Sequence, residues 1–285
     1  IVLFDRTKGL GAFSDTVREL RSRDFDLLID LQVYFKAGVI TALSGARRRL
    51  GFDRARARDA NWLFTTEMIP AHPVQHVQDQ YFEFLRALNI DPEPVEWDLG
   101  PWDHERQSQR EFRERFDRPL ASIVVATSKP EKDWMPERWA SVADILWSDY
   151  GMQPVLVGGT SDREVAAARV IAEASSCSPY SALGSGLRPL VSILDSSDIV
   201  IAPDTGPLHM TVAVGKPVIS LMGYTDPRRT GPYRSSHDLI IDAFHDPGES
   251  GSVTMETKDG RMKRISVSDV EAKLARWQEL YRGKS

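Results

Sequence analysis

The chain has 285 residues, an apolar fraction of 41% and a formal net charge of −5 at pH 7. This length accommodates one large or two ordinary domains with hydrophobic cores, and the negative charge gives no general attraction for nucleic acid. The only cysteine, Cys177, excludes an internal disulfide and a cysteine-rich metal site. No apolar run approaches the roughly 18 residues that a membrane-spanning helix requires.

The first third of the chain alternates between strand-like and helix-like segments. Short apolar runs predict strands, the second of them buried, at residues 1–4, 26–31 and 47–52. Apolar residues at helical spacing predict helices at 14–23, 34–45 and 76–90. We expect Ser14 to cap the first of these helices and Gly45 to end the second.

Residues 91–103 are rich in proline and acidic residues, which is typical of a linker or surface loop, and 104–116 predicts a charged helix. The alternation then resumes more clearly. Strands are predicted at 121–128, 154–159, 198–203, 216–223 and 238–244, with a weaker one at 179–183. Helices are predicted at 136–149, 162–174, 187–196 and 207–214, and a last one at 267–283 with Ser268 as its cap.

Strands that are apolar on both faces and separated by helices are typical of a parallel sheet covered on both sides. Two such blocks predict an α/β protein with two Rossmann-like domains facing a cleft. We place the first domain at 1–115 and the second at 116–265. Residues 266–285 are expected to form a helix that packs back towards the first domain.

In open parallel sheets, ligands bind beyond the carboxyl ends of the strands. This rule selects four polar loops of the second block, at 127–134, 158–164, 203–209 and 222–232. Their cations are Lys129, Lys132, Arg163, Arg228 and Arg229. Backbone N–H groups, hydroxyls and cations together favour an anion, and we interpret it as a phosphate.

The sequence Asp204-Thr205-Gly206 joins a buried strand to a short helix. Gly206 allows the backbone to approach a ligand closely, and the helix that follows supplies unpaired N–H donors. Asp204 fits better as a helix cap, or as an acceptor for a sugar hydroxyl or an arginine, than as a phosphate ligand. The alternative is a purely structural turn with His209 packed in the core, and the pattern alone leaves the two interpretations even.

The histidines and the acidic residues give no pattern that predicts a metal site. The six histidines show no paired ligand spacing on one helix, and the acid-x-acid pattern at 24–26 lies at the wrong end of its strand. Residues 47–58 carry six arginines and one aspartate. We interpret this run as a solvated face with ion pairs, and the alternative is a platform for a phosphorylated partner or an anionic membrane surface.

Three segments together carry a resemblance to a known family. "DTGPLHMTVAVGKPVISLMGYTDPRRTGP" (204–232) closely resembles the donor-site signature of glycosyltransferase family 9, the ADP-heptose:lipopolysaccharide heptosyltransferases. "TSKPEKDWMPERWA" (127–140) resembles a second family segment, with Met135 inserted before the proline. "DLLIDLQVYFKAGVITALSGARRRLGFDR" (26–54) is similar to a segment of the family's first domain.

The resemblance implies a GT-B fold, with the nucleotide sugar in the second domain and the acceptor facing the first. It implies inverting transfer of heptose from ADP-heptose to a lipopolysaccharide core or lipid A acceptor, without a metal or other cofactor. The enzyme would be cytoplasmic, with peripheral contact with the inner membrane. The alternatives are a GT-B transferase that uses another nucleotide sugar, and a remnant that binds a nucleotide sugar without turnover.

The resemblance also implies roles for particular residues. Donor contacts are expected from Thr127, Ser128, Lys132, Asp204, Thr205, Gly206 and His209. Glu164 is expected to contact the nucleoside, and the acceptor is expected at Arg47, Arg48 and Arg49.

The family begins with a strand and a glycine-containing loop whose acid is the proposed catalytic base. Residues 1–20 contain no match to that loop, and Asp15 is not assigned the role. The first domain is therefore expected to be incomplete, with the base in a preceding segment. We expect residues 1–285 alone to bind nucleotide but to transfer sugar poorly.

Overall fold

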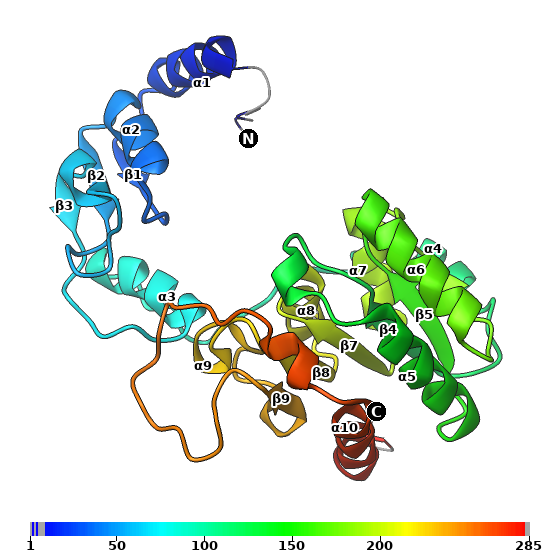
Figure 1. Cartoon of the computed structure of the whole chain (residues 1–285). Helices are drawn as coiled ribbons and strands as arrows, with labels where there is room; N and C mark the ends of the chain where they lie inside the picture. Colours follow the sequence, from blue (N-terminus) through cyan, green and yellow to red (C-terminus); the bar gives the residue numbers. More distant parts are fainter. Residues whose placement is uncertain (1, 3, 5–8, 283–285) are drawn as a thin grey trace. The chain divides into compact units, whose positions relative to one another are not determined.

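The computed structural model describes residues 2, 4 and 9–282. The chain divides into two compact units, an N-terminal unit (Ile1–Val95) and a C-terminal unit (Glu96–Ser285). Both contain a parallel sheet with helices, as predicted (Figure 1). Residues 1 and 3 of the strand expected at 1–4 lie outside the described residues. None of the described helices is long and apolar enough to cross a membrane.

The N-terminal unit contains a three-stranded parallel sheet in the order β1-β2-β3. Its strands are β1 (Leu27–Ile29), β2 (Arg48–Gly51) and β3 (Glu67–Met68). Its helices are α1 (Gly9–Ser22), α2 (Phe35–Leu43), α3 (Val77–Ala87) and the 3₁₀ turn η2 (Asn61–Phe64). Leu50, Phe52, Ile69 and Phe84 form its core. Gly45 follows the end of α2 with φ +87°, which confirms its predicted role.

Two local predictions in this unit are wrong, and one short strand was not predicted. Ser14 does not cap α1, because the helix begins at Gly9, and the Thr16 hydroxyl donates within the helix to the carbonyl of Ala12. The strand predicted to be buried, β1, is an edge strand of the described sheet, so its residues are half-buried or exposed. The two-residue strand β3 was not expected at all, because it is too short to show a periodic pattern.

The C-terminal unit contains six parallel strands in the order β6-β5-β4-β7-β8-β9. They are β4 (Leu120–Val124), β5 (Gln153–Val157), β6 (Tyr180–Ser181), β7 (Ile199–Pro203), β8 (Val218–Met222) and β9 (Ile240–Asp242). All residues of β4, β7 and β8 are buried, as the apolar runs predicted. In chain order, β5 and β6 are added on one side of β4. The next strand, β7, pairs with the other side of β4, and β8 and β9 continue outward from it. The switch point of the sheet therefore lies between β4 and β7.

Helices cover both faces of this sheet (Figure 1). One face carries α5 (Pro136–Ser148), α6 (Asp162–Ala174) and α10 (Val267–Leu280). The other carries α7 (Leu187–Ser196) and α8 (Gly206–Ala213), and α4 (Arg106–Arg113) packs against α7. The shorter elements are η3 (Asp103–Glu105), η4 (Pro130–Lys132), α9 (Pro227–Thr230), η5 (His237–Leu239) and η6 (Arg261–Arg264).

The division between the units lies before the expected boundary at residue 115. The reason is α4, whose charged sequence resembles a linker helix but whose contacts are with the C-terminal unit. Arg106 Nη1 lies 2.8 Å from Asp195 Oδ2 of α7, and the ring of Phe112 packs edge-on against that of Tyr180.

The last helix, α10, is capped by Ser266 rather than by Ser268. The Ser266 hydroxyl accepts from the backbone N–H of Asp269, and the Asp269 carboxylate accepts from the backbone N–H of Ser266, so the two form a capping box. The buried face of the helix, with Leu274 and Trp277, belongs to the core of the C-terminal unit. Its packing back towards the first domain stays a prediction.

Candidate functional site

A cavity of about 790 Å³, here called the switch-point cavity, opens at the carboxyl ends of β4, β5, β6 and β7. It lies beside the switch point, where open parallel sheets bind their ligands. Three of the four loops selected from the sequence meet there, through Ser128, Arg163 and Thr205. The fourth, 222–232, reaches the same place through its contacts with Asp204.

The chemical centre beside this cavity is an ion pair between two loops. Lys132 Nζ lies 2.7 Å from Asp204 Oδ2 and also donates to the Asp204 carbonyl at 3.2 Å. The two side chains are 18% and 9% exposed, so solvent screens the pair only weakly. The interpretation of Asp204 as a helix cap is wrong, because Thr205 occupies the N-cap position of α8.

Three further side chains surround the Asp204 carboxylate. Thr225 and Thr230 donate their hydroxyls to Oδ2 at 2.6 and 3.1 Å, and His209 Nε2 lies 3.5 Å from Oδ1. Burial alone would raise the pKa of Asp204, but the His209 contact, the Lys132 charge and the Thr225 hydrogen bond hold it well below its usual range. The carboxylate is therefore ionised at neutral pH. His209 is exposed, so the alternative interpretation, in which it packs in the core, is wrong.

The first turn of α8 faces the cavity. Thr205 occupies the N-cap position, yet its side chain makes no capping hydrogen bond. A Cβ atom added at Gly206 would meet nothing within 4 Å, because this backbone borders open space. Pro207 has no N–H, and the N–H of Leu208 donates to the Thr205 carbonyl at 3.1 Å. The N–H of Gly206 and the positive end of the helix dipole thus lie next to Lys132. Together they form a site for a negatively charged group.

The structure separates the predicted residues of the 127–134 loop. Ser128 is exposed and lines the cavity. Thr127 is buried, and its hydroxyl contacts the Lys129 carbonyl at 2.7 Å and Asp133 Oδ1 at 2.9 Å. Thr127 therefore fixes the shape of the loop, and it lines the cavity together with the more exposed Ser128. Donor contacts by either residue stay predictions. Arg163 lines the cavity as well and donates to the Thr127 carbonyl.

Glu164 stabilises the loop that precedes α6. Its Oε1 accepts from the backbone N–H of Gly159 at 2.6 Å, and its Oε2 accepts from the backbone N–H and hydroxyl of Ser161. With Ser161 as N-cap these contacts form a capping box at the start of α6. A Cβ at Gly159 would lie 2.8 Å from the carboxylate, so glycine is needed for this approach. A nucleoside contact by Glu164 stays a prediction.

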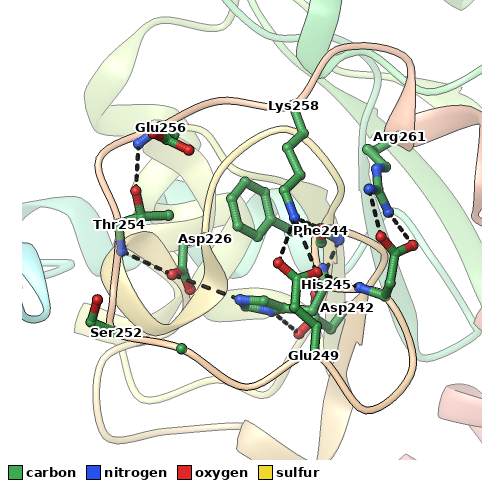
Figure 2. Close-up of polar contacts among 12 residues, drawn as sticks. Asp226, Asp242, Phe244, His245, Glu249, Ser252, Thr254, Glu256, Lys258 and Arg261 are labelled. Carbon is green, nitrogen blue, oxygen red and sulfur yellow. Dashed lines mark hydrogen bonds and ion pairs between the residues drawn. The ribbon is translucent and has the colours of Figure 1, made fainter.

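The loop that contributes Thr225 and Thr230 is itself anchored by the segment that follows β9 (Figure 2). Asp226 is fully buried and accepts from the backbone N–H of Thr254 at 3.1 Å. Burial raises its pKa, but hydrogen bonds from Arg228 and Thr254 outweigh burial and lower it. Arg228 is thus engaged with Asp226 and with the carbonyl of Gly251, and Asp226 stabilises the turn between the two threonines.

These segments match a known family. Residues 14–251 match the family model described as glycosyltransferase family 9 (heptosyltransferase). The chain belongs to this family.

The chain is similar in sequence to lipopolysaccharide heptosyltransferases of other bacteria. The lipopolysaccharide core heptosyltransferase OpsX of Haemophilus influenzae is 27% identical over 84% of this chain and 69% of its own length. A lipopolysaccharide heptosyltransferase 3 of Escherichia coli is 23% identical over 76% of this chain and 65% of its own length. The chain thus spans about two thirds of the length of these relatives.

Solved structures of low identity share the fold. The family 9 glycosyltransferase of Veillonella parvula superposes with a TM-score of 0.74 at 20% identity, covering 94% of this chain and 78% of its own. The E. coli ADP-heptose heptosyltransferase II gives 0.70 at 21% identity, covering 94% of this chain and 80% of its own. The two parallel α/β units of this family 9 glycosyltransferase are therefore those of a GT-B fold.

The inserted residue of the family segment at 127–140 lies at the start of α5. Met135 occupies the N-cap position of α5, and Pro136 takes the first helical position, where a missing N–H costs nothing. Trp134 is buried against Trp139 and donates to the Ile265 carbonyl at 3.0 Å. The insertion therefore falls where the chain enters the helix, and the buried tryptophan pair is kept.

The arginines expected at the acceptor have contacts within the N-terminal unit. Arg48 makes a bidentate pair with Glu67, at 2.7 and 2.9 Å, and Arg49 donates to the carbonyls of Phe64 and Ala46. Arg47 is exposed. The Arg48 pair agrees with the interpretation of the run as a solvated face with ion pairs, but Arg56 of the same run is buried and pairs with Asp53 and Glu83, so there the interpretation is wrong. An acceptor contact by Arg47, Arg48 or Arg49 stays a prediction.

Thr225 was missed by the sequence analysis and gives a first testable prediction. Thr225→Val keeps the shape of the side chain but removes the hydroxyl that donates to the buried Asp204 carboxylate. We expect the free energy of unfolding to fall by about 1.5–3 kcal/mol, the usual contribution of a hydrogen bond to a charged group. Urea unfolding measures the change. Thr225→Ser keeps the hydroxyl but removes the methyl group, and it is expected to lose less; a loss in Thr225→Ser as large as that in Thr225→Val would show that the hydroxyl contributes no more than the methyl group and would contradict the prediction.

Proposed function

We propose that this protein transfers heptose from ADP-heptose to a lipopolysaccharide core acceptor, and that the switch-point cavity holds the donor. The relatives are named as lipopolysaccharide heptosyltransferases, and a heptosyltransferase of E. coli with a similar fold was solved with ADP. One observation in this chain carries the proposal. A buried Lys132–Asp204 pair lies beside the open N-terminus of α8.

This arrangement suits the departure of a diphosphate. As the bond to the anomeric carbon breaks, negative charge grows on the leaving ADP and must be stabilised. Lys132 and the backbone N–H of Gly206 are fixed in place before the reaction. Because Asp204 remains ionised, it keeps the ammonium group of Lys132 at one position rather than acting as a proton donor.

The proposal also assigns residues to the sugar of the donor and to the acceptor. Ser128, Thr205 and His209 are proposed to contact the diphosphate or the sugar. The displacement would invert the anomeric carbon, with Lys132 and the helix N-terminus acting in place of a divalent metal. Arg47, Arg48 and Arg49 are proposed to face the acceptor, and an acceptor anchored in lipid would bring the enzyme to the inner surface of the membrane.

Calorimetry with ADP tests the donor site. We expect ADP to bind with the same affinity in EDTA and in magnesium, and more tightly than UDP or GDP. Binding that disappears with the chelator would contradict metal independence. Preference for UDP or GDP would instead identify a GT-B transferase with another nucleotide sugar.

A further inference from the structure

A second cavity lies in the C-terminal unit, between α4 and α7 and beside the edge strand β6. Its volume is about 490 Å³, within the range of about 300–1,000 Å³ that is typical of small-molecule sites. Phe112, Arg115, Tyr180, Arg188 and Pro189 contribute to its walls, and none of them lines the switch-point cavity. We call it the α4–α7 cavity.

Polar contacts fix the two helices on either side of this cavity. Asp195 of α7 accepts from Arg106 at 2.8 Å and from Gln109 at 2.5 Å. At the other end, Arg188 of α7 makes a bidentate pair with Glu105 at 2.5 and 2.6 Å. The hydrogen bonds from Arg188 hold the pKa of Glu105 at about 2, so this pair persists at neutral pH. The cavity walls are therefore held in place without a ligand.

The charges around the cavity do not balance. The guanidinium of Arg188 is matched by the carboxylate of Glu105. Arg115 is exposed and lines the cavity, and its Nη1 donates to the Tyr180 hydroxyl at 3.3 Å. Among the described residues, no carboxylate forms an ion pair with Arg115. One cation at the cavity is thus left to attract an anion.

Next to Arg115 the wall is aromatic. The rings of Phe112 and Tyr180 pack edge to face with centroids 6.0 Å apart, and Phe116 packs on both behind them, at 5.4 and 5.0 Å. Rings in this arrangement bind another flat apolar group well. The Arg115 guanidinium carbon lies 5.9 Å from the Phe112 centroid, so the charge and the apolar surface are adjacent.

We propose that the α4–α7 cavity binds a small organic anion with a flat apolar body. Its charged group pairs with Arg115, and its ring packs against Phe112 and Tyr180. This site is separate from the switch-point cavity and does not depend on the activity proposed for it.

Calorimetry at neutral pH with 2-naphthyl phosphate as the probe, and 2-naphthol as its neutral counterpart, tests the site. We expect Arg115→Gln to weaken binding of the phosphate about tenfold and to leave binding of the naphthol unchanged, since one charge-assisted contact is lost. Arg110→Gln is the matched control, because it removes an equal charge from an exposed residue of α4 outside the cavity. It is expected to weaken binding less than about twofold.

A phosphate probe could also enter the switch-point cavity, so Lys132→Met is included. Binding that is lost in this variant but kept in Arg115→Gln would place the probe in the switch-point cavity and overturn the proposal. Equal weakening by both arginine changes, or no binding of the phosphate by the unchanged protein, would overturn it as well. Loss that is confined to Arg115→Gln supports it.

Discussion

Replacing Lys132 by methionine is expected to lower kcat/KM about 100-fold, with most of the loss in kcat. Methionine keeps the apolar stem but removes the charge that faces the leaving diphosphate. Because that interaction strengthens as the bond breaks, its loss raises the barrier by about 2–4 kcal/mol. The rates are measured with ADP-heptose and a lipopolysaccharide core acceptor in the active enzyme.

The matched control is Lys129→Met, three residues earlier in the same loop. The Lys129 ammonium lies over the ring of Tyr224 at 5.6 Å, and the residue is exposed. We expect this change to alter kcat/KM less than about threefold, in line with the small contribution of exposed charges. If Lys132→Met keeps the unchanged kcat and kcat/KM while its melting temperature falls, Lys132 has only a structural role.

Replacing Asp204 by asparagine is expected to lower the free energy of unfolding at pH 7 by about 2–4 kcal/mol, because Lys132 then lacks its buried partner. The difference in the free energy of unfolding between the unchanged protein and Asp204→Asn should depend on pH. The folded protein holds the pKa of Asp204 below its unfolded value of about 3.9. The stability that the carboxylate contributes is therefore complete above about pH 5, and is lost as the pH falls through the lowered folded value.

Urea unfolding of the protein and of the Asp204→Asn variant between pH 7 and pH 3 measures this loss. The two curves of free energy against pH should approach each other below about pH 4. Asp117→Asn, which changes an exposed carboxylate, should keep the pH dependence of the unchanged protein. A difference between protein and Asp204→Asn that stays constant down to pH 3 would show that Asp204 is not held ionised by its neighbours.

The sheet of the C-terminal unit could be predicted because its strands are apolar on both faces. Runs such as 198–203 and 216–223 predicted buried parallel strands, and β7 and β8 lie within them. The position of the cavity then followed from the rule that ligands bind beyond the carboxyl ends of such strands. The edge strand β1 was misjudged because its sequence looks buried while the described sheet places it at an edge.

The centre of the site could not be predicted in the same way. Lys132 is followed by Asp133 and preceded by Glu131, so local sequence favours surface pairs. The 3₁₀ turn η4 instead directs it to Asp204, a residue 72 positions away. No short-range pattern encodes that contact, and none marks Thr225 as its support. The capping role of Glu164, which we did not predict, does have a local signal, since Ser161 followed three residues later by glutamate is the capping-box signature.

A crystal structure of the protein with ADP tests the central claim most directly. The account predicts that the diphosphate lies within hydrogen-bond distance of Lys132 Nζ and of the backbone N–H of Gly206, with the nucleoside in the switch-point cavity. Density for ADP elsewhere, or a diphosphate that contacts neither Lys132 nor the start of α8, would contradict it.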